Sequence, residues 1–143
     1  MKNKKRIGKI TPPMIEYYRR VIGDLTKRFP AAFNKSFPVP LEVGVHNQIE
    51  KLTGLSEKEV SVLLTIWTRR YEYKCMAASV GHRFDLNGNR VGKIADGEMV
   101  GFINAIPLTK KKNLTTFCKA YLKATGQPPL IFVPIKDRPI LNL

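Results

Sequence analysis

The sequence predicts a mostly helical domain of the α+β class with one small β-hairpin. Three observations carry this prediction. Apolar residues recur at helical spacing over several stretches, as they do in amphipathic helices. Ser56-Glu57-Lys58-Glu59 has the pattern of a capping box, which marks the start of a central helix. Asn87-Gly88 lies between two short runs of strand-forming residues and is a strong signal for a hairpin turn.

The first helix is predicted from its start signal and its stop signal. Thr11 precedes Pro12 and Pro13, which suits an N-cap followed by proline in the first turn. Pro30 ends the helix. Its apolar stripe consists of Met14, Tyr18, Val21, Ile22, Leu25 and Phe29. Residues 31–43, rich in Phe and Pro, predict a packed loop without regular structure.

Two helices are predicted on either side of Gly54. The first runs from about Gly44 to Thr53, and Gly54 is its C-terminal stop. Its inward positions are Val45, Ile49 and Leu52. The second begins at Ser56 and is expected to continue to about Tyr71, followed by a connection of small residues. Its buried face is Val60, Leu63, Leu64, Trp67 and Tyr71.

The C-terminal half is predicted to hold the hairpin, two helices and a tail. Asp96 begins a short helix near Glu98 to Ile106, and Pro107 ends it. A last helix, capped by Asn113, runs from about Leu114 to Ala124 and presents Leu114, Phe117, Tyr121 and Leu122 as its apolar face. Residues 127–135 predict an extended apolar tail that packs back on the domain, because an exposed apolar tail invites aggregation.

The charge of the chain indicates a polyanion as its partner. The formal net charge is +14 over 143 residues, and nucleic acid is the commonest polyanion. Residues 1–40 carry ten Lys or Arg and two acids, and residues 101–143 carry seven and one. Residues 41–100 carry eight of each sign, so the two ends supply the excess positive charge.

Catalytic and metal-binding patterns are missing from the sequence. It contains no phosphate-binding glycine loop and no nucleophile elbow, so we expect a protein that is not an enzyme and takes no cofactor. His46, His82, Cys75 and Cys118 lack metal-ligand spacing. The basic N-terminus has no apolar segment behind it, and two cysteines favour free thiols, so the expected location is the cytoplasm.

One constellation points to a nucleic-acid end. The run Arg69-Arg70-Tyr71-Glu72-Tyr73 is followed, ten residues after Tyr73, by Arg83-Phe84-Asp85-Leu86-Asn87-Gly88. Aromatic rings and guanidinium groups at one helix–hairpin corner suit the stacking and clamping of a terminal nucleotide. Further short matches precede it in order: Arg28-Phe29-Pro30, Phe33, Pro40 to Val45, Leu55-Ser56, Leu64 and Thr68.

With these matches, the stretch from Leu25 to about Met99 resembles the ProQ/FinO family of bacterial RNA chaperones. The resemblance implies a compact FinO-like domain with concave and convex faces over residues 13–107. A basic arm over residues 1–12 precedes it, and residues 108–143 add a basic helix and the apolar tail. It also implies regulation of gene expression after transcription, and we expect the chain to be a monomer. Its partners are small RNAs, bound at a terminator hairpin with a single-stranded 3′ U-rich tail, and the 3′ ends of mRNAs.

The resemblance further implies which residues meet the RNA. Tyr73 and Arg83 match a pocket for the last nucleotide, and Ser56, Glu57 and Lys58 match a helix start that meets phosphates of the tail. Glu42, Glu57 and Glu72 stand where better-known members carry basic residues. We therefore expect other cations to contact the RNA backbone: Arg69, Arg70, Lys74, Arg19, Arg20, Lys27, Arg28, Lys110, Lys111 and Lys112.

Two other functions fit parts of the sequence. Residues 44–72 have the order of a helix-turn-helix that reads DNA, although the second helix starts with Glu57-Lys58-Glu59 rather than with polar and basic groups suited to the major groove. A basic protein-interaction or ribosome-associated module using the apolar tail is the other alternative, and it predicts no preference for RNA 3′ ends.

Overall fold

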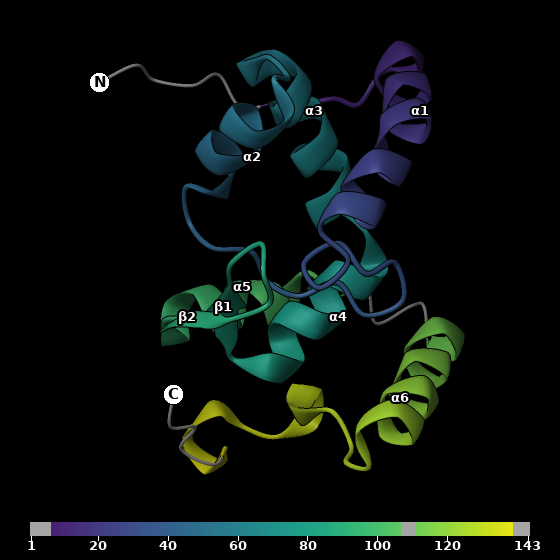
Figure 1. Cartoon of the computed structure of the whole chain (residues 1–143). Coiled ribbons are helices and arrows are strands. Elements are labelled where there is room, and N and C mark those ends of the chain that lie inside the picture. Colours follow the sequence, from purple (N-terminus) through teal and green to yellow (C-terminus); the bar gives the residue numbers. More distant parts are fainter. Residues whose placement is uncertain (1–6, 107–110, 139–143) are drawn as a thin grey trace.

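The fold is a helical domain with one antiparallel hairpin, as the sequence predicts (Figure 1). The computed structural model describes residues 7–106 and 111–138. The elements in order are α1 (Pro12–Arg28), α2 (Val45–Thr53), α3 (Glu57–Thr68), α4 (Tyr71–Val80), β1 (His82–Phe84), β2 (Arg90–Lys93), α5 (Asp96–Asn104), α6 (Lys111–Thr125) and two 3₁₀ turns, η1 (Leu130–Phe132) and η2 (Ile135–Asp137). None of the helices in these ranges is long and apolar enough to cross a membrane.

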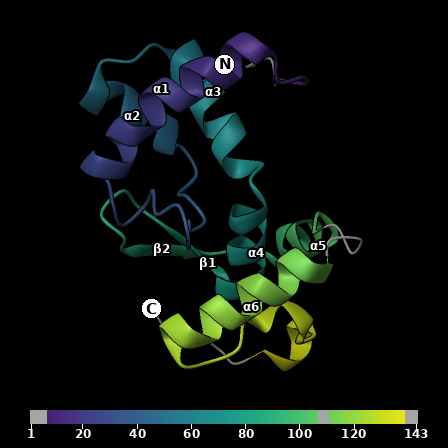
Figure 2. The same cartoon turned by 90° about the vertical axis from the view of Figure 1, so that its right-hand side faces the viewer.

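The core consists of two clusters, one above the other in Figures 1 and 2. The upper cluster packs α1, α2 and α3 around Trp67, whose ring lies 5.1 Å from that of Phe33. The lower cluster packs α4 against α6 and η1 through residues such as Cys75 and Phe117. The predicted 31–43 loop is well packed and buries Phe33, Pro38 and Pro40.

Most helix boundaries follow the predicted caps. Thr11 is the N-cap of α1, and Gly54 ends α2 with a φ of 75°. The capping box of α3 is complete, because Ser56 Oγ accepts from Glu59 N–H at 3.2 Å and Glu59 Oε1 accepts from Ser56 N–H at 3.0 Å. Two predicted apolar positions are wrong: Leu52 is 54% exposed and Leu122 is 48% exposed.

The central helix is shorter than predicted, and a second helix follows it. The expected helix to Tyr71 stops at Thr68, because Arg70 is extended at φ −65° and ψ 146° and becomes the N-cap of α4. The predicted small-residue connection is instead helical. Its Ala77, Ala78 and Ser79 are buried, and small side chains let α4 pack closely against its neighbours.

The hairpin has the predicted position but a different turn. Gly88 has a φ of 84°, whereas Asn87 does not have a positive φ, so the pair is not the expected turn with two left-handed residues. Asp85 organises the loop instead, since its Oδ1 accepts from the backbone N–H groups of Asn87 and Asn89, both at 2.9 Å. These hydrogen bonds keep the pKa of the Asp85 carboxyl low.

The C-terminal part differs from the prediction in three ways. Helix α5 begins at Asp96, as predicted, but ends at Asn104, two residues before the predicted Ile106, and Pro107 lies outside the described residues. Helix α6 already includes Lys111, so Asn113 lies inside the helix and does not cap it. The tail does pack back, with Ile131 buried, but it forms η1 and η2 rather than an extended strand.

Candidate nucleic-acid interface

Tyr73 and Arg83 meet at the main chain of Leu41. The Tyr73 hydroxyl accepts a hydrogen bond from Leu41 N–H at 3.1 Å, and Arg83 Nη1 donates to Leu41 O at 2.9 Å. The two polar groups therefore contact adjacent parts of one residue. The sequence indicated Tyr73 and Arg83 but gave no sign that Leu41 joins them.

The hairpin holds Leu41 in this place. Phe84 N–H donates to Pro40 O at 2.8 Å, and Glu42 N–H donates to Phe84 O at 2.9 Å, so the segment 40–42 pairs with β1 in parallel. Tyr73 lies in the first turn of α4, and Arg83 lies on β1. The hairpin register and the start of α4 together set the distance between the hydroxyl and the guanidinium group.

The stacking role expected of Tyr73 does not fit its surroundings. The residue is only 4% exposed, because its ring belongs to the upper core cluster. A base cannot lie on a ring that protein side chains already cover. What remains is the hydroxyl group. Burial raises the pKa of Tyr73, so the hydroxyl keeps its proton at neutral pH, and among the described residues no acceptor takes that proton.

Arg83 is held from a second side by Glu98. Arg83 Nη2 lies 2.5 Å from Glu98 Oε2, although Asp85 is the acidic residue nearest to Arg83 in the sequence. Asp85 is committed to the hairpin turn. Glu98 comes from the first turn of α5, fifteen residues along the chain, and no short-range pattern links it to Arg83.

The start of α3 is not part of this cluster. Ser56, Glu57 and Lys58 stand at one end of α3 and α4 follows the other end, and twelve residues of helix separate them by about 18 Å (Figure 1). The Ser56 hydroxyl is occupied by the capping box. Hydrogen bonds from Ser56 and Tyr17 lower the pKa of Glu59, so a carboxylate stands beside this helix start.

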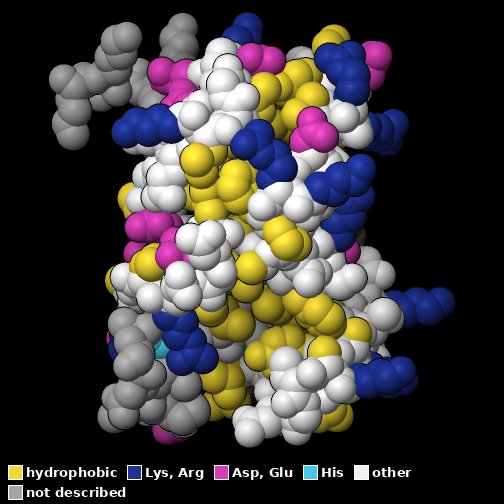
Figure 3. Space-filling model, in the orientation of Figure 1, with side chains coloured by type: hydrophobic (Ala, Val, Ile, Leu, Met, Phe, Trp, Pro, Cys, Tyr) yellow, Lys and Arg dark blue, Asp and Glu magenta, His cyan; other side chains and the backbone are white. Residues whose placement is uncertain are grey.

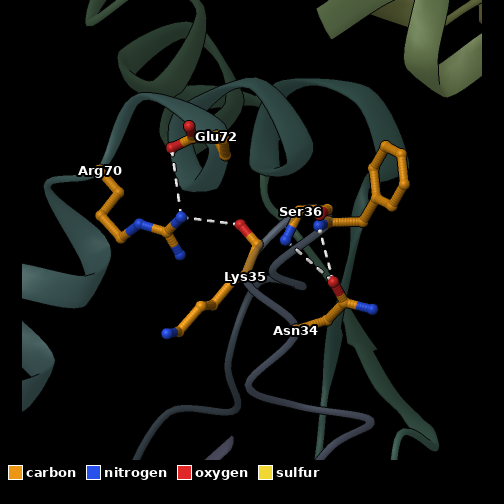
Figure 4. A network of polar contacts seen from close by, with 6 residues as sticks. Asn34, Lys35, Ser36, Arg70 and Glu72 are labelled. Carbon is orange, nitrogen blue, oxygen red and sulfur yellow. Dashed lines mark hydrogen bonds and ion pairs between the residues drawn. The ribbon is translucent and has the colours of Figure 1, made fainter. Parts of the chain in front are cut away.

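Three arginines expected to contact RNA hold the protein's own main chain. Arg28 donates to Leu52 O at 2.6 Å, and Arg69 donates to Ile7 O and Gly8 O. Arg70 donates to Lys35 O at 2.7 Å and pairs with Glu72 (Figure 4). Its guanidinium carbon lies 4.6 Å from the centre of the Trp67 ring. Asn34 shapes the same loop, because its side-chain oxygen accepts from the N–H groups of Ser36 and Phe37.

The other predicted backbone contacts are accessible where they are described. Arg19, Arg20, Lys27 and Lys112 are exposed, and Lys74 is half-buried. Lys110 and the side chain of Lys111 lie outside the described part of the chain. In Figure 3, Lys and Arg side chains gather along the edge that α1 and α6 form in Figure 1, so the two ends of the sequence contribute to one basic edge.

Comparison with known proteins decides the family. A model of the ProQ/FINO family matches residues 15–119, which is more than half of the chain. The chain belongs to the ProQ/FinO family. The match runs from α1 into α6 and includes Tyr73 and Arg83.

Two solved structures share the ProQ/FinO fold. One is the NMR solution structure of a ProQ homolog from Legionella pneumophila, with a TM-score of 0.51 and 17% identity over 74% of this chain and 89% of that chain. The other is the crystal structure of a FinO-like RNA chaperone from Neisseria meningitidis MC58, with a TM-score of 0.50 and 23% identity over 78% of this chain and 83% of that chain. No curated protein matches the sequence.

Reactive groups of this ProQ/FinO chain are sheltered or scattered. Burial raises the pKa of the Cys75 thiol to about 11, so it is protonated and unreactive at neutral pH. In residues 7–106 and 111–138, no three His, Cys, Asp or Glu side chains come together as metal ligands. The described geometry offers hydrogen-bond donors and positive charge rather than a reactive centre.

The ProQ/FinO arrangement also bears on the helix-turn-helix alternative. Helix α3 packs against both α1 and α2 and buries Val60, Val62, Leu63 and Trp67. A recognition helix needs a free polar face to enter the major groove. Its exposed start, with Glu57 and an ionised Glu59, has the wrong charge for DNA.

Proposed function

We propose that this chain is an RNA chaperone that recognises structured small RNAs, and mRNA 3′ ends, at a terminator hairpin with a single-stranded 3′ U-rich tail. It acts as a monomer in the bacterial cytoplasm and regulates gene expression after transcription. The observation that carries the proposal is the meeting of the Tyr73 hydroxyl and the Arg83 guanidinium at Leu41. The family match and the FinO-like RNA chaperone among the structural neighbours support it.

The chemistry of this cluster suits the last nucleotide of an RNA. The Tyr73 O–H and the remaining Arg83 N–H groups are donors, so their natural ligands are phosphate oxygens and ribose hydroxyls. A 3′-terminal ribose presents two adjacent hydroxyls beside a phosphate. The exposed cations of α1, with Lys112 on α6, then hold the backbone of the hairpin by charge alone.

The start of α3 has a separate place in this proposal. Since Ser56, Glu57 and Lys58 lie about 18 Å of helix away from α4, they contact phosphates several nucleotides before the terminal one. Arg69 and Arg70 contribute mainly by fixing the fold, because their guanidinium groups bind main-chain oxygens.

The test is a competition assay with wild type, Tyr73→Phe and Arg83→Ala at about 0.15 M salt, the physiological ionic strength. The RNAs are a hairpin with a 3′ U tail, the same RNA with a 3′ phosphate, and the hairpin without a tail, and duplex DNA is included. Tyr73→Phe keeps the buried ring and removes only the hydroxyl. We expect each variant to lose about tenfold in affinity for the tailed RNA, the value of one charge-assisted hydrogen bond, and little for the untailed one.

The outcomes separate the alternatives. Folded variants that bind the tailed RNA as tightly as wild type would remove the pocket from the proposal. If wild type bound tailed and untailed RNA equally, the protein would be an RNA-binding protein that does not recognise the 3′ end. Preference for duplex DNA would favour the helix-turn-helix alternative. Thermal melts accompany each variant, because Tyr73→Phe leaves the Leu41 N–H without its acceptor and costs about 1–3 kcal/mol.

Glu98 competes with RNA for Arg83. Its carboxylate occupies Arg83 Nη2, so an incoming phosphate or hydroxyl meets a guanidinium that is already paired. We expect Glu98→Gln to raise affinity for the tailed RNA about threefold to tenfold, measured by fluorescence anisotropy. Stability should change by less than about 1 kcal/mol, because Glu98 is half exposed and such ion pairs contribute little.

Asp24→Asn on α1 is the matched control, since it makes the same change in net charge at an exposed site. If Glu98→Gln and Asp24→Asn raised the affinity for RNA equally, the effect would be one of net charge and would contradict competition at Arg83.

A further inference from the structure

A cavity of about 510 Å³ lies away from the Tyr73–Arg83 cluster. It opens between the end of α4, the base of the hairpin, the first turn of α5 and the C-terminal turns η1 and η2. The family match ends at residue 119, so the wall formed by residues 130–138 lies outside the matched region. The volume falls in the range of sites that hold a small molecule.

The walls of this C-terminal cavity are largely aliphatic. They include Val80, Ile94, Met99, Leu130 and Ile135, contributed by five different parts of the chain. Aliphatic side chains on several sides favour the burial of an apolar body. A cavity lined in this way binds a ring or a short chain through the hydrophobic effect.

The polar lining has an excess of positive charge. Lys93, Lys136 and Arg138 line the cavity, and Asp96 is the single carboxylate in the lining, which leaves two positive charges in excess. His82 also lines it and is only 3% exposed, and in the described structure its Nδ1 is buried without a hydrogen-bond partner. A buried polar atom without a partner is costly, and a ligand that bonds to it removes that cost.

Arg138 ties the C-terminal wall to the domain. Its guanidinium donates to Ala78 O at 2.8 Å, Leu130 O at 2.7 Å and Val133 O at 3.0 Å. Arg138 Nη1 also donates to Met99 Sδ at 3.4 Å, and no carboxylate of the described residues pairs with the guanidinium. The segment that closes the cavity thus brings an uncompensated positive charge into its lining.

We propose that this cavity binds a small amphipathic anion, a molecule with an apolar ring or chain and one carboxylate, sulfonate or phosphate group. The aliphatic walls take the apolar body, the cations attract the acidic group, and His82 offers it a hydrogen bond. The site is distinct from the RNA cluster, because His82 and Arg83 are consecutive on β1 and their side chains point to opposite faces of the hairpin.

The test compares two fluorescent probes that share an apolar body and differ in charge. These are 8-anilinonaphthalene-1-sulfonate, an anion, and N-phenyl-1-naphthylamine, which is neutral. We expect the full chain to bind one molecule of the anionic probe at least about tenfold more tightly than the neutral one, the factor that a modest free-energy difference supplies. In a heteronuclear NMR titration, the shifts should fall on residues 80–82, 93–99 and 130–138.

Variants separate the charge, the hydrogen bond and the volume. The double variant Lys93→Ala with Lys136→Ala should bind the anionic probe about tenfold more weakly and the neutral probe with unchanged affinity. His82→Phe should lower the affinity for the anionic probe about threefold. Ile135→Trp should prevent the binding of both probes, because the larger side chain fills the cavity. Lys119→Ala with Lys123→Ala is the matched control, because it removes the same charge from exposed positions of α6.

The proposal fails if the neutral probe binds as tightly as the anion, if the two double variants behave alike, or if the NMR shifts fall outside the cavity. Cooperative thermal unfolding of every variant establishes that the probe reports a folded cavity and not an expanded state, which also binds the anionic probe.

Discussion

Gly88→Ala should destabilise the protein by about 2–5 kcal/mol. Gly88 has a φ of 84°, a conformation that costs an L-residue about 1–2 kcal/mol. A Cβ at this position would also lie 2.8 Å from the Cβ of Ala31, in the packed loop that follows α1. Neither atom is the end of a flexible chain, so the backbone must shift, which adds about 1–3 kcal/mol. Urea unfolding at equal protein concentration measures the loss.

Two other glycines separate the strain from the clash. Gly126 has a φ of 77° but open space around its Cβ position, so Gly126→Ala should cost only the backbone term. Gly92 lies in β2 with open space and no positive φ, so Gly92→Ala should be almost neutral. Equal stability of the Gly88 and Gly126 variants would mean that the contact with Ala31 is not restrictive. RNA binding should fall with Gly88→Ala, since the turn sets the register of Arg83.

Arg70→Ala should destabilise the protein by about 2–4 kcal/mol and affect RNA binding mainly through folding. The change removes a charge-assisted hydrogen bond to Lys35 O, worth about 1.5–3 kcal/mol. It also removes the stacking on Trp67, worth about 0.5–2 kcal/mol. Arg70 Nη1 is buried without a hydrogen-bond partner in the described structure, which is unfavourable. The substitution removes this unfavourable group, so a part of the lost stability is regained. Thermal and urea unfolding give the size of the effect.

Arg70→Lys tests whether the planar guanidinium group is needed. It should restore less than half of the stability that Arg70→Ala loses, because an ammonium group cannot stack and donate in the same geometry. Lys74→Ala, one turn along α4, is the control, because it removes the same charge and its side chain makes no hydrogen bond or ion pair with the described residues. If Arg70→Ala were as stable as wild type but bound RNA poorly at all tail lengths, Arg70 would be an RNA contact as the sequence suggested.

Several parts of the fold follow from local sequence signals. The caps at Thr11 and Ser56, the stop at Gly54 and the hairpin near Gly88 are short-range patterns, and each occurs where the sequence predicts it. Their energy comes from hydrogen bonds and backbone conformation within a few residues, which a sequence contains in full. The order of these signals was also enough to indicate the ProQ/FinO family and to place Tyr73 and Arg83 at one corner.

The tertiary structure decided what each side chain does. Helix α3 stops at Thr68 because Arg70 reaches the loop at Lys35, a contact between segments thirty-five residues apart. Tyr73 offers a hydroxyl rather than a ring face because the core covers the ring, and Arg83 is shared between Leu41 and Glu98. The length of α3 separates Ser56 from both. Burial, partners and separation depend on how distant segments pack, so local patterns in the sequence determine the elements and the residue types, whereas only the packing assigns their roles.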